Sequence, residues 1–311
     1  MHSVHKIIFI IIFFLNSPLY ALENFIVLKV NNNIITKIDI ENEYKYLIAL
    51  NKSLKELEKD KIYSLAKDSI VRENIKKDEI EKFMSIDNYN EEYANSIFKN
   101  FYTNLGFSSA ENFENYLSSY GIEFSNVKKK IFIEIAWNSF IYEKFINQIY
   151  IDEDSIKKKI TKRYKDKKEI TLYLLSEILF QTENVENLEK KSQEINDSIM
   201  KYGFEATASI FSVSDTSKIG GKLDWIEENQ LSENIKKKVK TLDIGNHTEP
   251  IVVPGAYLIL KLNNIKSEKK SQVFDLNEEL EKSIKFEQNR QLDKFSKIYF
   301  NRAKKNSYIS E

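Results

Sequence analysis

The side chains that most often carry nucleophilic or metal chemistry are scarce in this sequence. Cysteine is absent, and the three histidines are His2, His5 and His247. Without cysteine the chain has no disulfide, no thiolate metal site, no cysteine nucleophile and no lipid-modified cysteine. A serine–histidine–aspartate triad would need His247, because the first two histidines lie in a segment that we expect to be removed. Since glycine-rich phosphate loops are missing as well, we expect no metal ion and no cofactor.

Composition and charge limit the class of protein. With 42% hydrophobic and 30% charged residues, the 311-residue chain can fold around a core in one or two domains. Lysine and arginine number 47, and so do aspartate and glutamate, which gives a formal net charge of +0. Lysine runs such as residues 128–130 stand among acidic residues on predicted helices, a pattern typical of solvated faces. We therefore expect no nucleic-acid partner.

Residues 1–21 have the layout of a secretory signal peptide. Lys6 precedes an apolar run over residues 7–15, and Ala21 offers a small residue at the cleavage point. The run is shorter than the ~20 residues that a membrane-spanning helix needs. Export without cysteine suits the bacterial periplasm. The alternative is an uncleaved anchor, which would keep the protein weakly associated with the membrane.

Hydrophobic periodicity predicts the elements that would position a site. A hairpin is predicted over residues 25–35, and a helix follows from a capping box in which Thr36 precedes Asp39 by three residues. Helical spacing then continues until residues 169–266, where strands and helices alternate. The helical period returns in the C-terminal segment, whose apolar stripe needs a partner surface. We expect that last helix to pack on the N-terminal helices.

The predicted fold class is α+β, with a mainly helical domain that carries an inserted α+β domain. The expected divisions are a signal peptide at 1–21, a helical domain at 22–168, an α+β domain at 169–266 and a C-terminal helix at 267–311.

The inserted region resembles the parvulin family of peptidyl-prolyl isomerase domains. Ser176 opens the sequence S-E-I-L, like the S-x-I-L of the family's first strand, and the pair Gly220-Gly221 followed by K-L-D-W is similar to its G-G-x-L-G-W. Further matching stretches are residues 242–245 (L-x-x-G), residues 249–251 (x-P-I) and residues 255–262 (the last strand, G-x-H-I-L-K-V). Because these motifs follow in order, the resemblance implies a parvulin-type fold.

The resemblance also implies where an isomerase site would lie. Parvulins have two facing histidines, a neighbouring cysteine or aspartate, and Met and Phe side chains in a proline pocket. The catalytic positions implied here are Glu177 and Tyr257 for the histidines, with Ser212 and Asp215 near the third polar position. The proline pocket would be lined by Val213, Leu231 and Ile235. Since no imidazole is present at either histidine position, we expect isomerase activity that is weak or absent.

The flanking segments resemble the SurA family of periplasmic chaperones. Residues 30–40 are similar to its V-N-x-x-V-I-x-x-x-D-V opening, and the order of helices agrees. The resemblance implies an ATP-independent chaperone, monomeric or dimeric, whose partners are unfolded outer-membrane or other exported proteins. The alternative function is that of an active prolyl isomerase, which speeds a slow folding step.

Overall fold

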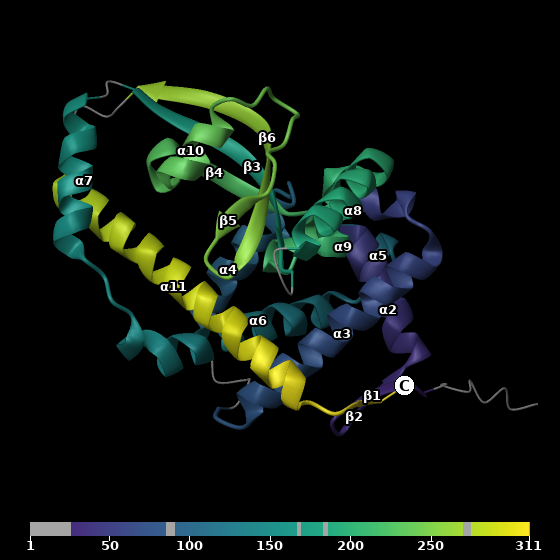
Figure 1. Ribbon diagram of the computed structural model, residues 1–311. Helices are drawn as coiled ribbons and strands as arrows, with labels where there is room; N and C mark the ends of the chain where they lie inside the picture. Colours follow the sequence, from purple (N-terminus) through teal and green to yellow (C-terminus); the bar gives the residue numbers. More distant parts are fainter. Residues whose placement is uncertain (1–25, 85–90, 167–168, 183–185, 270–274, 311) are drawn as a thin grey trace, which may run out of the picture.

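The computed structural model describes residues 26–84, 91–166, 169–182, 186–269 and 275–310. The predicted signal peptide, residues 1–21, lies outside the described residues. Helices account for most of the described chain, and one four-stranded sheet with its own helices forms a separate layer (Figure 1). The α+β fold class is therefore confirmed. No helix within the described ranges has both the length and the apolar character needed to cross a membrane.

A small sheet joins the start of the described chain to its end. Strands β1 (Ile26–Val30) and β2 (Asn33–Thr36) form the predicted antiparallel hairpin, and β7 (Ile309–Ser310) pairs with the other edge of β1. Asn31 takes the left-handed conformation, with φ of 51°, that a tight hairpin turn requires. The last residues of the chain thus return to the first strand (Figure 1).

The hairpin leads into a set of helices that share buried apolar faces. The predicted capping box is present at the start of the first one: Asp39 N donates to Thr36 Oγ1 at 3.3 Å, and Thr36 N donates to the Asp39 carboxylate at 2.8 Å. The helices are α2 (Lys37–Leu50), α3 (Lys59–Glu81), α4 (Glu91–Asn104), α5 (Ala110–Ser119), α6 (Phe124–Phe145) and α7 (Glu153–Asp166), with 3-10 turns η1 (Lys52–Glu56) and η2 (Ile146–Gln148).

Helix α11 (Leu276–Asn306) contacts α3, α6 and α7, and in Figure 1 it is the long yellow helix that passes from α7 toward the small sheet. Trp137 of α6 is fully buried, and its Nε1 donates to Ser296 Oγ of α11 at 2.8 Å. Phe145 and Phe295 stack with ring centroids 4.8 Å apart. The small sheet, α2 to α7 and α11 together are termed the helical domain.

The remaining elements form the sheet domain. Its four strands are antiparallel in the order β4-β3-β6-β5, and β3 and β6 pair along their whole length. The elements are β3 (Glu169–Phe180), α8 (Glu186–Tyr202), α9 (Phe204–Phe211), η3 (Asp215–Ile219), β4 (Lys222–Glu227), η4 (Glu228–Gln230), α10 (Glu233–Val239), β5 (Ile251–Val253) and β6 (Ala256–Lys269).

Alternation along β3 separates two cores, one on each face of the sheet. Ile178 and Phe180 pack with side chains from α8 and α9 on one face. Leu175 and Leu179 pack with side chains from α10 and with Leu258 on the opposite face. Near the middle of β3, odd-numbered residues therefore face α10 and even-numbered residues face α8 and α9. Two candidate site residues can meet only if their side chains lie on the same face.

Candidate functional site

Glu177 lies in the middle of β3 and is held by two hydroxyl groups. Its side chain points to the same face as Leu175 and Leu179, because residues alternate along the strand. Ser214 Oγ donates to Glu177 Oε1 at 2.6 Å, and Thr216 Oγ1 donates to the same oxygen at 2.9 Å. Hydrogen bonds to a carboxylate are stronger than those between neutral groups. This polar cluster ties the segment before β4 to the central strand.

The double glycine brings β4 against the backbone of Glu177. Gly220 and Gly221 both have φ of 73°, a left-handed conformation that side chains disfavour. Glu177 N donates to Gly221 O at 2.8 Å. A Cβ atom on Gly221 would lie 2.1 Å from the carbonyl oxygen of Glu177, which is far inside van der Waals contact. Glycine at position 221 is therefore required by the closeness of the two strands.

Ser212 and Asp215 do not reach the Glu177 carboxylate. Ser212 is buried, and its Oγ accepts from Leu179 N at 3.1 Å and from Ser214 N at 3.3 Å. Asp215 begins η3, and its side chain is 68% exposed and lies 3.5 Å from Lys76 Nζ of the helical domain. Both predicted catalytic residues thus make structural contacts.

Tyr257 lies on the opposite face of the sheet from Glu177. It pairs with Phe180 across β3 and β6, and the two rings stack with centroids 5.6 Å apart. Its ring packs with the core that α8 and α9 cover. Leu258, the next residue, faces the same side as Glu177. The structure therefore does not bring the two predicted histidine positions together.

The three predicted pocket residues lie on one face of the sheet. Leu231 belongs to the apolar core on the Glu177 face, and Val213 and Ile235 pack against that core. Leu231 is buried, and the other two are half-buried. A carboxylate and two hydroxyl groups thus stand beside an apolar surface. Within the described ranges, no three histidine, cysteine or acidic side chains are grouped closely enough to hold a metal ion.

Ser214 and Thr216 are polar residues of this site that the sequence motifs do not single out. They lie two residues apart in a short stretch that also holds Ser212, which gives hydroxyl groups at alternate positions. Ser214 is the N-cap of η3 and Thr216 lies within it, so the spacing of the hydroxyl groups alone does not predict that both bind Glu177. The pairing of this stretch with Glu177 depends on the tertiary structure.

A network of charges fixes η3 to the helical domain. Lys76 of α3 is buried, and its Nζ lies 2.5 Å from Glu134 Oε2 of α6 and 3.5 Å from Asp215 Oδ1. Lys218 Nζ, also in η3, lies 3.4 Å from Glu134 Oε1. Burial opposes the charge on Glu134, but Lys76 and Lys218 outweigh it and lower the pKa of Glu134 to about 2. The carboxylate therefore stays ionised between two lysines.

Uncharged contacts extend this attachment. Asn51 Nδ2 donates to Glu205 O and to Ser209 Oγ of α9, both at 3.0 Å. Ala206 of α9 is fully buried within a core of the helical domain, and Ile219 of η3 packs against another. The segment that supplies the hydroxyl donors to Glu177 is thus part of an interface between the two domains.

Comparisons with known proteins agree with this architecture. Residues 172–264 match the rotamase family, described as the PPIC-type PPIASE domain. The match covers the sheet domain from β3 into β6 and includes Glu177, the η3 segment and Tyr257. The chain contains a PPIC-type rotamase domain. The sheet domain is accordingly called the PPIC-type domain.

Relatives and solved structures give the wider context. The chain is 22% identical over 161 residues to "Chaperone SurA" of Pseudomonas putida, a match that covers 50% of this chain and 38% of the relative. The chain thus spans about two fifths of the length of that curated relative. A crystal structure of a PpiC-type peptidyl-prolyl cis-trans isomerase domain is 24% identical, with a TM-score of 0.28, and covers 33% of this chain and 96% of its own. A SurA-like chaperone of Campylobacter jejuni is 14% identical, with a TM-score of 0.32, over 92% of this chain and 98% of its own.

Proposed function

We propose that this protein is an ATP-independent periplasmic chaperone that binds unfolded exported proteins, including outer-membrane proteins. The similarity to proteins named Chaperone SurA supports the chaperone role. The observation that carries the proposal is that the candidate catalytic side chains make contacts within the folded protein. Ser212 Oγ accepts from Leu179 N of β3, Asp215 contacts Lys76, and Tyr257 packs on the face of the sheet opposite Glu177. The PPIC-type domain then acts as a rigid lobe of a binding protein.

Exposed aromatic side chains of the helical domain supply contacts for unfolded clients. Tyr150 is 79% exposed and Phe83 is 58% exposed, and Tyr93 and Tyr142 are exposed as well. Aromatic rings offer large contact areas without strict geometric demands, which suits clients of many sequences. Client segments would bind across several such positions with modest affinity at each.

Light scattering tests this proposal. A urea-denatured outer-membrane barrel protein is diluted into buffer with an equimolar amount of the chain, and no nucleotide is present. We expect aggregation to be suppressed, and addition of ATP to change nothing. Serum albumin at the same concentration is the control for nonspecific protection. Aggregation equal to that with albumin would contradict the proposal.

The second candidate function is an active prolyl isomerase. One observation favours it: the Glu177 carboxylate, with the Ser214 and Thr216 hydroxyls bound to it, lies on the same face of the sheet as the apolar core that includes Leu231 and contacts Val213. Twisting an X-Pro bond needs an apolar pocket and nearby polar groups, but no covalent step. A protease-coupled assay on proline-containing tetrapeptides separates the two functions. A rate well above the spontaneous one that falls in Glu177→Gln would support the isomerase.

A further inference from the structure

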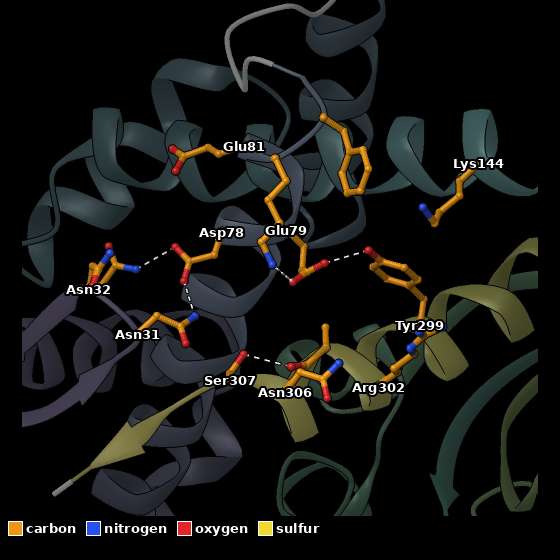
Figure 2. A pocket seen from close by; sticks show the side chains of 14 residues that line it. Asn31, Asn32, Asp78, Glu79, Glu81, Lys144, Tyr299, Arg302, Asn306 and Ser307 are labelled. Atoms are coloured by element: carbon orange, nitrogen blue, oxygen red, sulfur yellow. Dashed lines mark hydrogen bonds and ion pairs between the residues drawn. The ribbon is translucent and has the colours of Figure 1, made fainter.

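A groove of about 720 Å³ opens in the helical domain (Figure 2). It is formed by the β1–β2 turn, the end of α3, one residue of α6 and the last turns of α11, and no residue of the PPIC-type domain lines it. Its volume falls within the range of about 300–1,000 Å³ that small-molecule sites in proteins occupy. None of the candidate isomerase residues is among the residues that line this groove, so the groove is a separate candidate binding site.

Two central carboxylates of the groove already have internal donors. Asp78 accepts from Asn31 Nδ2 at 2.6 Å and from Asn33 Nδ2 at 2.8 Å. Glu79 accepts from the Tyr299 hydroxyl at 2.7 Å, and Lys82, the residue that follows α3, donates to its other oxygen. Figure 2 shows these bonds as dashed lines along the wall of the groove. These acidic groups are thus engaged with the protein itself.

Two cations of the groove, Lys144 and Arg302, form no direct salt bridge with the groove carboxylates. Lys144 Nζ lies over three aromatic rings, with centroid distances of 4.5 Å to Phe83, 5.2 Å to Tyr299 and 5.4 Å to Phe140. Arg302 is exposed on α11, one turn after Tyr299. Among the residues that the structure describes, neither cation lies within salt-bridge distance of a carboxylate. Burial alone would raise the pKa of Glu79, but Lys82, the Tyr299 hydroxyl and the nearby charge of Lys144 together lower it. Lys144, Tyr299 and Arg302 line the same groove, and Figure 2 shows the two cations on either side of Tyr299.

We propose that this groove binds the C-terminal carboxylate of an unfolded polypeptide, an inference that rests on the proposed chaperone function. The planar guanidinium of Arg302 matches the two oxygens of a carboxylate, and Lys144 adds a second positive charge. The Phe83 ring and the side-chain amides of Asn32 and Asn306 in the same groove suit the end of a peptide, which favours a polypeptide carboxylate over a free phosphate.

The rest of the groove suits the last residues of a peptide. Phe83, 58% exposed, offers an apolar surface for a C-terminal aromatic or aliphatic side chain. Asn32 and Asn306 also line the groove and present side-chain amides, which can both donate to and accept from a peptide backbone. Capture of a C-terminal carboxylate together with its neighbouring backbone is a known mode of peptide recognition.

Fluorescence anisotropy with three short labelled peptides tests the inference on the full chain. The first peptide ends in Ala-Phe with a free carboxylate, the second is its C-terminal amide, and the third is the amide with an aspartate before the Ala-Phe end. Because a hydrogen bond to a charged group contributes about 1.5–3 kcal/mol, we expect the free acid to bind about tenfold or more tightly than both amides.

Two variants locate the site. Arg302→Gln and Lys144→Gln should each weaken binding of the free acid about tenfold and leave the amide unchanged. Lys304→Gln is the matched control, because it removes an exposed cation of the same helix that does not line the groove. Circular dichroism confirms that each variant is folded before binding is measured.

Three results would overturn the inference. The first is equal affinity for the free acid and its amide. The second is equal affinity for the free acid and the aspartate-containing amide, and the third is a loss of affinity in Lys304→Gln as large as that in Arg302→Gln. The same preparations are assayed for suppression of aggregation. Suppression without carboxylate-dependent binding refutes only the groove assignment, whereas loss of suppression refutes the proposed chaperone function.

Discussion

Replacing Lys76 by methionine removes the buried cation that joins the two domains. In the wild type, Lys76 Nζ lies 2.5 Å from Glu134, and its side chain is only 4% exposed. Removal of one partner from a buried ion pair costs about 3–5 kcal/mol, because the other charge is left without compensation. Lys218 remains 3.4 Å from Glu134. We therefore expect the lower end of that range, a loss of about 3 kcal/mol in the free energy of unfolding.

Urea denaturation followed by tryptophan fluorescence measures this loss. The chain has two tryptophans, with Trp137 in the helical domain and Trp225 in the PPIC-type domain. Two background proteins, Trp137→Phe and Trp225→Phe, let each domain be followed separately. If the network couples the domains, Lys76→Met should lower both transition midpoints.

The neighbouring lysine provides a matched control. Lys77 is 42% exposed and pairs with Glu81 at 3.8 Å on the surface of α3. Surface pairs of this kind contribute less than about 1 kcal/mol, so Lys77→Met should change little. Glu134 also pairs with Lys218, so the triple variant Lys76→Met/Glu134→Leu/Lys218→Met, which removes all three charges of this cluster, should recover most of the lost stability. A Lys76→Met protein as stable as Lys77→Met would refute the reasoning.

The pH dependence of stability follows from the same network. The folded pKa of Glu134 is lowered to about 2, whereas an unperturbed glutamate titrates near ~4.3. A depressed folded pKa contributes stability above the unfolded pKa and loses it as the pH falls toward the folded pKa. We expect the wild type to lose stability between about pH 4.5 and pH 2, with a smaller loss in Glu134→Gln.

Two further predictions concern the local structure. Gly221→Ala should destabilise the PPIC-type domain by about 3 kcal/mol or more in urea unfolding, because it combines a left-handed φ with a close contact to Glu177 O. Gly245 has φ of 96° and open space around it, so Gly245→Ala should lower the free energy of unfolding by less. Equal losses in the two variants would contradict the steric argument. Thr36→Ala should lower the stability of the helical domain by about 1 kcal/mol through loss of the α2 cap, and an unchanged thermal midpoint would show that the capping box contributes nothing.

Local signals predicted the elements of the helical domain well. The hairpin before Thr36, the capping box with Asp39 and the long C-terminal helix depend on nearby residues, so the sequence alone reveals them. The attachment of η3 could not be predicted in the same way. Lys76 and Asp215 lie far apart in the sequence, and each stands in a charge-rich stretch that favours solvent exposure. That lysine is buried only where α3 packs against α6, with Trp137 and Glu134 of α6 and Asp215 of η3 around its ammonium group.

In the candidate site, a shift of one residue in the motif alignment changes the face of the sheet on which the chosen residue lies. Between Gly255 and Leu262 the chain has one residue more than the motif G-x-H-I-L-K-V, so an alignment from the glycine selects Tyr257. An alignment from Lys261 selects Leu258 instead. Side chains alternate between the faces of a strand, and a shift of one residue therefore moves the chosen residue to the other face. The register of β3 with β6 places Leu258, and not Tyr257, on the Glu177 face.

Binding of an unfolded client is the central claim, and a titration tests it directly. A fluorescently labelled outer-membrane barrel protein, kept unfolded by rapid dilution from urea, is titrated with the full chain in buffer without nucleotide, and its anisotropy is recorded. We expect saturable binding that unlabelled unfolded barrel displaces and the same barrel folded in detergent does not. Absence of saturable binding, or equal displacement by the folded barrel, would contradict the claim.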